Sequence, residues 1–185
     1  IGVRLVGSEM CIRDSSNLET GGFVRSNDLV DYPNIQYHFF PSLVLDHGRK
    51  TPTCHSFQAH VGPMRPTSRG EIKLKSNKPD DAPSIQFNYM QTEHDLNEMR
   101  DGIEIAREIF NQRAFDEYRG KELSPGIQEK SKESINEFIR NKGDTAYHPS
   151  CTCKMGNDES SVVNEELKVY GIDKLRVVDA SIMPN

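Results

Sequence analysis

Residues 35–40 read Ile-Gln-Tyr-His-Phe-Phe and are followed by Pro41. Aromatic and β-branched side chains favour a pleated, half-buried strand, and proline cannot continue the ladder of a central strand. Three more short alternating runs follow at 57–61, 71–74 and 84–89, with Gly and Pro between them. The pattern predicts an antiparallel sheet.

Two amphipathic helices are expected after these strands. Thr92 followed by Asp95 is a variant of the capping box, and apolar residues then recur at spacings of three and four. A shorter helix is expected from Ser131 to near Gly143, whose missing Cβ suits a left-handed cap. The predicted fold class is therefore α+β, an antiparallel sheet backed by helices. The apolar positions are Leu96, Met99, Ile103, Ala106 and Phe110 in the first helix and Ile135, Phe138 and Ile139 in the second.

The last quarter of the chain is less regular. Residues 144–156 have no period and concentrate His, Pro, Cys and Gly, which predicts a loop, and loops on rigid scaffolds often carry chemistry. Residues 162–169 and 175–178 are expected to form short strands.

Bulk composition excludes several classes of protein. A length of 185 residues suits one domain, and the net charge of -5 comes from mixed charges without a basic block, so a nucleic-acid partner is not expected. No apolar run approaches the roughly 20 residues needed to cross a bilayer. Four unevenly spaced cysteines favour a reducing compartment over a secreted disulfide scaffold. We expect a protein that is not secreted, located in the cytoplasm or peripherally at the inner face of a membrane.

His148 is the first candidate for catalysis. An imidazole titrates near a pH of about 6.5, so it can accept a proton from an alcohol without extreme tuning. Pro149 biases the preceding residue towards an extended conformation, which would hold the ring on a stiff backbone. The plainer interpretation is a loop histidine bonded to a nearby carbonyl group, in a domain without chemistry.

A zinc site is an alternative for the same loop. Thiolates and imidazoles are the preferred ligands of tetrahedral zinc. The Cys-Thr-Cys spacing lacks the two-residue gap of zinc knuckles, and two adjacent ligands rarely reach one ion. We therefore predict no metal site and interpret the thiols as small, inert side chains. The residues in question are His148, Cys151 and Cys153, with Cys54 and His55.

The strand at 35–40 carries a second candidate site. Alternation places Tyr37 and Phe39 on one face and His38 and Phe40 on the other. Core packing is the default interpretation of such aromatic residues. The alternative is that some of them line a pocket for a quaternary ammonium group, which aromatic ring faces attract.

Two long motifs resemble the C-terminal signature pair of the glucose-methanol-choline oxidoreductases. They are residues 147–156, Tyr-His-Pro-Ser-Cys-Thr-Cys-Lys-Met-Gly, and residues 175–184, Leu-Arg-Val-Val-Asp-Ala-Ser-Ile-Met-Pro. Within that family the Ser-Cys-Thr-Cys-Lys version, together with residues 21–26 and 122–126, is most similar to the choline-oxidising members. The resemblance runs from about residue 16 to residue 185.

The resemblance implies a flavoprotein that uses FAD to oxidise a primary alcohol. The expected alcohol is choline and the product betaine aldehyde, a precursor of glycine betaine; a member that oxidises another primary alcohol is the alternative. His148 matches the histidine that accepts the hydroxyl proton while a hydride leaves to the flavin. Asp179 and Ala180 match the segment that runs alongside the FAD. Near the substrate, His38 matches a second histidine, with Tyr37, Phe39 or Phe40 around the trimethylammonium head.

The resemblance also implies a division of the chain. Residues 16–145 would form the substrate-binding domain, and residues 146–185 would carry the active-site loop and a partial return towards the FAD-binding domain. Residues 1–15 match nothing that follows and are interpreted as a foreign leader. The FAD fingerprint Gly-x-Gly-x-x-Gly does not occur among the 13 glycines. The sequence also stops before the family segment that supplies the histidine's Asn or His partner, so we expect this chain alone to bind no FAD and to be inactive.

Overall fold

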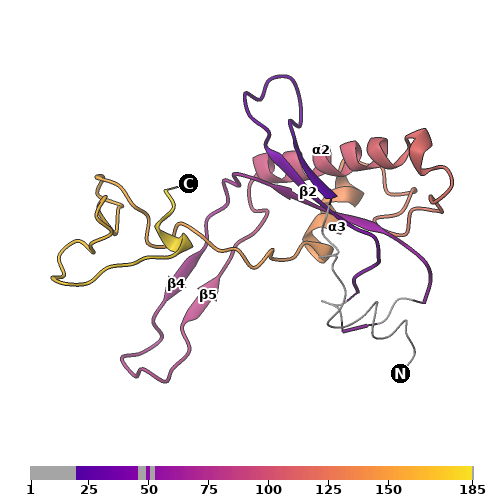
Figure 1. Cartoon of the computed structure of the whole chain (residues 1–185). Coiled ribbons are helices and arrows are strands. Elements are labelled where there is room, and N and C mark those ends of the chain that lie inside the picture. Colours follow the sequence, from indigo (N-terminus) through magenta and orange to yellow (C-terminus); the bar gives the residue numbers. More distant parts are fainter. Residues whose placement is uncertain (1–19, 46–48, 51–52, 185) are drawn as a thin grey trace, which may run out of the picture. The chain divides into compact units, whose positions relative to one another are not determined.

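A computed structural model describes residues 20–45, 49–50 and 53–184, so the predicted leader at 1–15 lies outside the described residues. The chain divides into two compact units, Ile1–Asn141 and Lys142–Asn185. The first contains the strands and both long helices (Figure 1). The domain limits predicted from the sequence stay a prediction.

The first unit is built on a three-stranded antiparallel sheet. Its strands are β1 (Thr20–Val24), β2 (Ile35–Phe40) and β3 (Gln58–Pro63), in the order β1-β2-β3. The predicted strand at 35–40 is confirmed at both ends and occupies the centre of the sheet. β1 was not predicted, because its Thr-Gly-Gly-Phe-Val sequence contains two glycines, which are depleted in strands.

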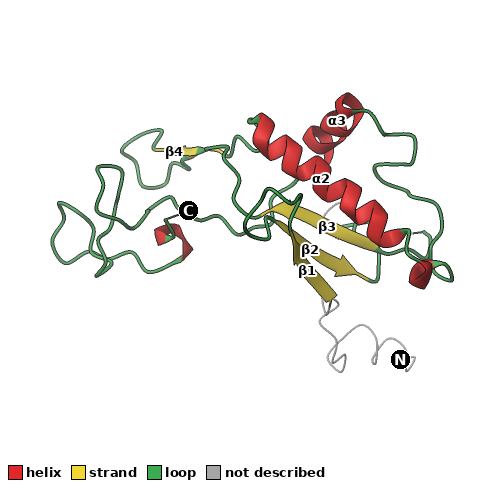
Figure 2. Ribbon diagram, turned by 90° about the horizontal axis from the view of Figure 1, so that it is seen from above, coloured by secondary structure: helices red, strands yellow, loops and turns green. Residues whose placement is uncertain are grey.

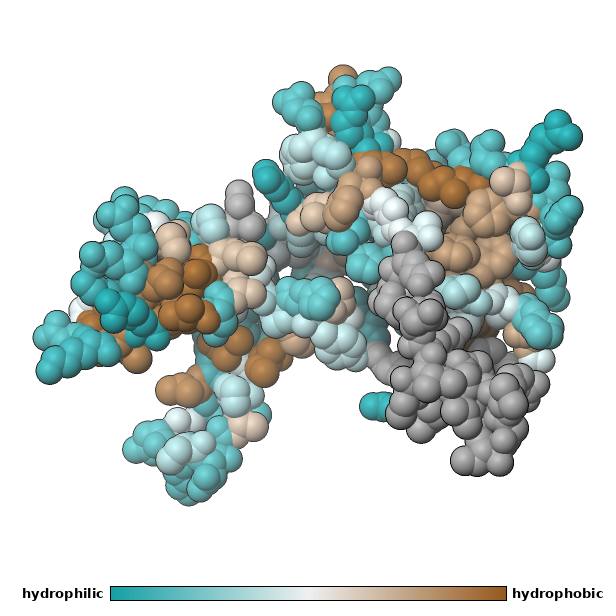
Figure 3. Space-filling model, in the orientation of Figure 1, coloured by the Kyte–Doolittle hydropathy of each residue, from teal (hydrophilic) through white to brown (hydrophobic). Residues whose placement is uncertain are grey.

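The other predicted strands form a separate ribbon, so the expectation of one sheet holding all four runs is wrong. β4 (Glu71–Lys73) pairs only with β5 (Ser84–Gln86). β5 ends before the predicted limit because Asn88 and Met90 have φ angles of 53° and 56°, which a strand cannot adopt. Ile72 and Ile85 face each other across the ribbon and stay about half exposed. Figure 3 shows hydrophobic residues among hydrophilic ones in the region where Figure 1 labels β4 and β5.

Both predicted helices are present, and the α+β class is confirmed. α2 (Glu93–Phe110) begins where predicted, since the Thr92 hydroxyl accepts a hydrogen bond from the Asp95 backbone N–H. α3 (Lys132–Lys142) follows after the short 3-10 helix η2 (Arg113–Phe115). Figure 2 shows α2 lying across one face of the sheet, with α3 packed on α2.

The contact between α2 and the sheet depends on Gly102. A Cβ at this position would lie 2.6 Å from Val61 Cγ1 and 3.3 Å from Ile35 Cγ2, so only glycine permits this approach. The Tyr37 hydroxyl donates to the Gly102 carbonyl oxygen at 2.6 Å. The sheet core is formed by Ile35, Tyr37 and Ala106, and the helix core by Leu96, Ile103, Ile135 and Ile139.

The second unit consists of turns and single bridges. The prediction of strands at 162–169 and 175–178 is wrong, since only isolated bridges such as Val163 with Val169 and Lys168 with Arg176 occur there. Left-handed φ angles interrupt any longer ladder: Leu167 has 65° and Lys174 has 62°. Asp179 then caps the 3-10 helix η3 (Ala180–Ile182).

Within the described part of the chain, no helix combines the length and the apolar character that a membrane crossing requires.

Candidate functional site

His148 lies in an exposed loop with unusual backbone on both sides. Tyr147 has a φ of 59° and Cys151 a φ of 70°, both in the left-handed region that bulky residues rarely adopt. The Tyr147 N–H donates to the Thr145 hydroxyl at 3.0 Å, which helps to hold this turn. Backbone strain of this kind persists where the surrounding structure fixes it and often marks a functional site.

The loop after His148 is bonded to the segment that carries Asp179 and Ala180. The backbone N–H of Cys153 donates to the Ser181 carbonyl oxygen, and that of Met155 donates to the Ile182 carbonyl oxygen, both at 2.9 Å. The structure therefore brings the two halves of the signature pair side by side, although 18 residues, 157–174, separate them in sequence.

The Asp179 side chain stabilises this arrangement. Its carboxylate accepts a hydrogen bond from the Ser181 backbone N–H at 2.8 Å, and bonding from Ser181 holds the pKa of Asp179 below its usual value. Val178 is 70% exposed, and Asp179 and Ala180 are also exposed. The segment thus presents open backbone and side-chain surface against which a planar cofactor could lie.

A hydrogen-bonded turn follows the His148 loop in the sequence. Lys154 Nζ lies 2.8 Å from Asp158 Oδ2 and 2.9 Å from Ser160 Oγ. The Lys154 ammonium and the Ser160 hydroxyl hold the pKa of Asp158 well below its usual range. Val163 is fully buried, and its backbone is hydrogen-bonded to Lys154 and Gly156.

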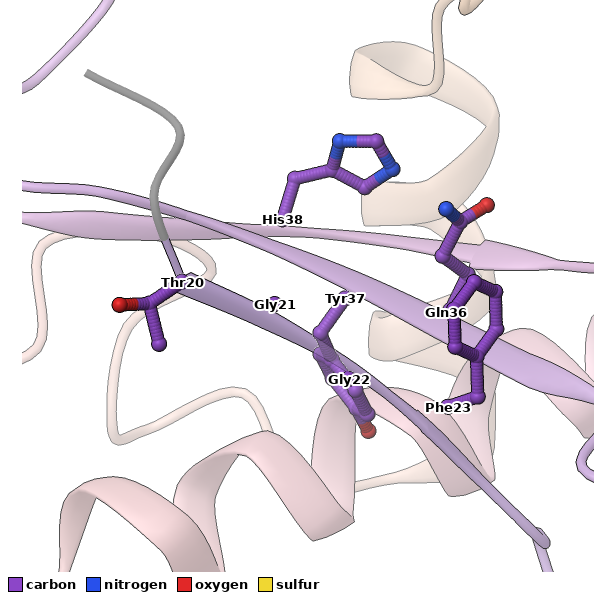
Figure 4. A pocket seen from close by; sticks show the side chains of 7 residues that line it. All are labelled: Thr20, Gly21, Gly22, Phe23, Gln36, Tyr37 and His38. Carbon is purple, nitrogen blue, oxygen red and sulfur yellow. The ribbon is translucent and has the colours of Figure 1, made fainter. Parts of the chain in front are cut away.

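The second candidate group lies on the sheet of the first unit. His38 and Phe40 project from the face opposite α2, whereas Tyr37 and Phe39 face the helix; Figure 4 shows His38 and Tyr37 on opposite sides of β2. Tyr37 is only 7% exposed, and burial, followed by the charge of Glu108, raises its pKa well above the usual value. The Phe39 ring contacts those of Phe57 and Phe110 at centroid distances of 5.8 and 6.4 Å.

A depression of about 230 Å³ opens beside β1 and β2. Gly21 lies directly opposite His38 in the strand register, so no side chain covers the imidazole from that side. Glycine is required there, because a Cβ would lie 2.6 Å from the Tyr37 carbonyl oxygen. The lining consists of Thr20, Gly21, Gly22, Phe23, Gln36, Tyr37 and His38 (Figure 4).

His60 is a candidate that the sequence argument did not single out. It lies opposite His38 in the register, its ring is 4.3 Å from that of Phe40, and its Nε2 is 2.6 Å from Gln58 Nε2. Burial and the neighbouring His38 both lower the pKa of His60. The signal was available in the alternation of residues 57–61, which already placed positions 58 and 60 on one face.

No metal centre assembles from the residues that the structure describes, since no group of three or more His, Cys, Asp or Glu side chains has a suitable arrangement. Cys54 and His55 belong to the first unit, and His148, Cys151 and Cys153 to the second. The zinc alternative gains no support.

Comparison with protein families gives one match over most of the chain. A family described as GMC oxidoreductase matches residues 66–185, which include α2, α3 and the whole second unit.

Curated relatives match over nearly all of this chain. An oxygen-dependent choline dehydrogenase of Pseudomonas savastanoi pv. phaseolicola is 54% identical over 170 residues, which are 92% of this chain and 30% of the relative. An oxygen-dependent choline dehydrogenase of Acinetobacter baumannii is 55% identical over 170 residues, or 31% of its length. The chain therefore spans about a third of the length of these relatives.

Among solved structures, pyridoxine 4-oxidase from Mesorbium loti has the same fold. The TM-score is 0.79 at 30% sequence identity, with 89% of this chain and 33% of that chain covered.

Proposed function

The chain belongs to the GMC oxidoreductase family, and we propose that it works as the C-terminal part of an FAD-dependent choline dehydrogenase. In this proposal the whole enzyme oxidises choline to betaine aldehyde, a precursor of glycine betaine. Identity of 54% to choline dehydrogenases over 92% of the chain supports the substrate. The proposed mechanism is supported mainly by the two backbone hydrogen bonds between the His148 loop and the Asp179 segment.

His148 is the proposed catalytic base. Its ring is exposed in a loop whose backbone is fixed at Tyr147 and at Cys153, so the imidazole can accept the hydroxyl proton of an alcohol placed beside it. Asp179 and Ala180 are the proposed contacts to FAD. When bound, FAD supplies the acceptor for the hydride that leaves the alcohol carbon.

The proposed substrate residues are His38, Tyr37, Phe39 and Phe40, with different roles. His38 and Phe40 share the face opposite α2, so they are the ones assigned to contact the substrate, Phe40 through its ring face to the trimethylammonium head. Tyr37 and Phe39 pack on the α2 side and hold the strand in place.

The second candidate is a dehydrogenase for an uncharged primary alcohol. It is favoured by the similarity to pyridoxine 4-oxidase, at 30% identity and a TM-score of 0.79. For either candidate, the proposed location is the cytoplasm or, peripherally, the inner face of a membrane.

A substrate panel on the full-length enzyme tests the function. Choline is compared with its uncharged isostere 3,3-dimethylbutan-1-ol, in wild type, His148→Asn and the control His55→Asn, an exposed histidine of the first unit. We expect choline to be preferred and His148→Asn to lower kcat by roughly two or more orders of magnitude. Near-normal turnover of His148→Asn contradicts the catalytic role, and preference for the isostere favours the second candidate.

A further inference from the structure

Two hydrogen bonds of the Gln58 side chain indicate which ring nitrogen of His60 carries the proton. The backbone N–H of Val44 donates to Gln58 Oε1 at 3.1 Å, so the amide oxygen points to Val44 and the NH₂ group points to His60. The distance from that NH₂ group to His60 Nε2 is 2.6 Å. An amide NH₂ group only donates, so Nε2 must accept, and the ring is the neutral tautomer with its proton on Nδ1.

The neutral ring is placed beside the proposed substrate residues. His60 is the direct cross-strand neighbour of His38, and side chains of such pairs stand on the same face with Cβ atoms about 5 Å apart. The Phe40 ring lies against His60 at a centroid distance of 4.3 Å. This stretch of the face therefore has two imidazoles and an aromatic ring, and none of the residues of β1, β2 and β3 is Lys or Arg.

We propose that Gln58 and His60 form a charge-selecting pair for the alcohol substrate. By holding His60 neutral next to His38 and Phe40, Gln58 lets a quaternary ammonium head approach this face without like-charge repulsion. The proposal rests on the proposed function and adds a positioning residue, Gln58, and a specificity-determining residue, His60.

The kinetic test uses the full-length enzyme with choline and 3,3-dimethylbutan-1-ol. His60→Lys puts a permanent positive charge on the face, and His60→Gln is the neutral control at the same position. We expect His60→Lys to raise KM for choline about tenfold relative to KM for the isostere, because only the charged head is repelled. His60→Gln should keep the ratio of the two KM values within about twofold of wild type.

The outcomes separate the two proposals. An active enzyme in which His60→Lys leaves the KM ratio unchanged overturns the charge-selecting role and leaves the proposed function standing. A wild-type enzyme that oxidises neither alcohol overturns the proposed function and the charge-selecting role with it.

A second measurement reads the tautomer directly. The ¹⁵N chemical shifts of His60 in the full-length protein should show a protonated Nδ1 and an unprotonated Nε2. Gln58→Glu should reverse this, because a carboxylate accepts from an N–H at Nε2. A wild-type His60 protonated at Nε2 would overturn the role of Gln58.

Discussion

The backbone N–H of Cys153 lies 2.9 Å from the carbonyl oxygen of Ser181, which joins the loop of the proposed base to the segment of the proposed cofactor contact. A catalytic base and a hydride acceptor must be held close together, since small misplacements of reacting groups are costly to the rate. Backbone hydrogen bonds can hold the two segments together whatever side chains those segments carry. The conformation of the 180–182 turn therefore controls where the His148 loop lies.

Replacing Asp179 with Ala should loosen this turn. The variant removes the acceptor for the Ser181 N–H, so we expect faster amide exchange at Ser181 and Cys153 and a lower kcat in the full-length enzyme. Hydrogen exchange followed by mass spectrometry measures the first effect. Asp179→Asn is the matched control, because its amide oxygen can still accept the bond. Unchanged exchange in Asp179→Ala contradicts the role of the cap.

Replacing Gly102 with Ala should lower the free energy of unfolding. Alanine favours helix by up to about 1 kcal/mol over glycine, but overpacking against Val61 and Ile35 costs about 1–3 kcal/mol. Val61 is β-branched and cannot turn away easily, so the clash at 2.6 Å outweighs the gain. Urea denaturation should show a net loss of about 1 kcal/mol. Glu104→Ala, on the exposed side of α2, is the control and should not destabilise the protein.

Periodicity was sufficient to predict the elements that have a clear apolar face. The stripe from Leu96 to Phe110 predicted α2, and the β-branched and aromatic run at 35–40 predicted β2. The strand predicted at 162–169 is absent, because residues with a left-handed φ angle, such as Leu167, cannot be recognised from composition. Periodicity also missed β1, in which Gly21 permits the close approach to the Tyr37 carbonyl oxygen and leaves His38 uncovered.

The candidate site was predictable only in part, for a different reason. His148 and Asp179 came from motifs, whereas their connection through Cys153 and Ser181 is made by backbone atoms that every residue carries. The pairing of His60 with Gln58 needed the register of β2 against β3 and the direction of one amide group. Neither is encoded in the spacing of a single strand.

Replacing Arg107 with Lys should free the segment after η2. Its guanidinium bonds both carboxylate oxygens of Glu122, at 2.8 to 3.2 Å, and the carbonyl oxygens of Gly126 and Glu129. A lysine ammonium cannot reproduce this fork, so we expect a loss of roughly 1–2 kcal/mol in urea denaturation, discounted for partial solvent exposure. Arg113→Lys, an exposed arginine of η2, should have no measurable effect. Equal stability of both variants would contradict the role of Arg107.

Protonation of the Asp95 carboxylate at low pH should destabilise the first unit. Its carboxylate is fully buried and accepts hydrogen bonds from the backbone N–H groups of Thr67 and Ser68 at 2.7 and 2.9 Å and from both hydroxyls. Burial alone would raise the pKa of Asp95, but these bonds outweigh it and hold the pKa well below its usual range. Asp95 thereby joins the start of α2 to the turn before β4.

Replacing Asp95 with Asn should therefore change both stability and its dependence on pH. At pH 7 we expect a loss of about 2–3 kcal/mol, because the amide NH₂ faces donors it cannot satisfy. A pKa lower in the folded state means that the carboxylate stabilises fully above the unfolded value of about 3.9 and that this stability falls as the pH drops below it. Between pH 7 and pH 2, the free energy of unfolding should therefore fall less steeply with decreasing pH in Asp95→Asn than in wild type. Asp31→Asn, an exposed aspartate, should keep the wild-type slope, and an unchanged slope in Asp95→Asn would show that other carboxylates control acid unfolding.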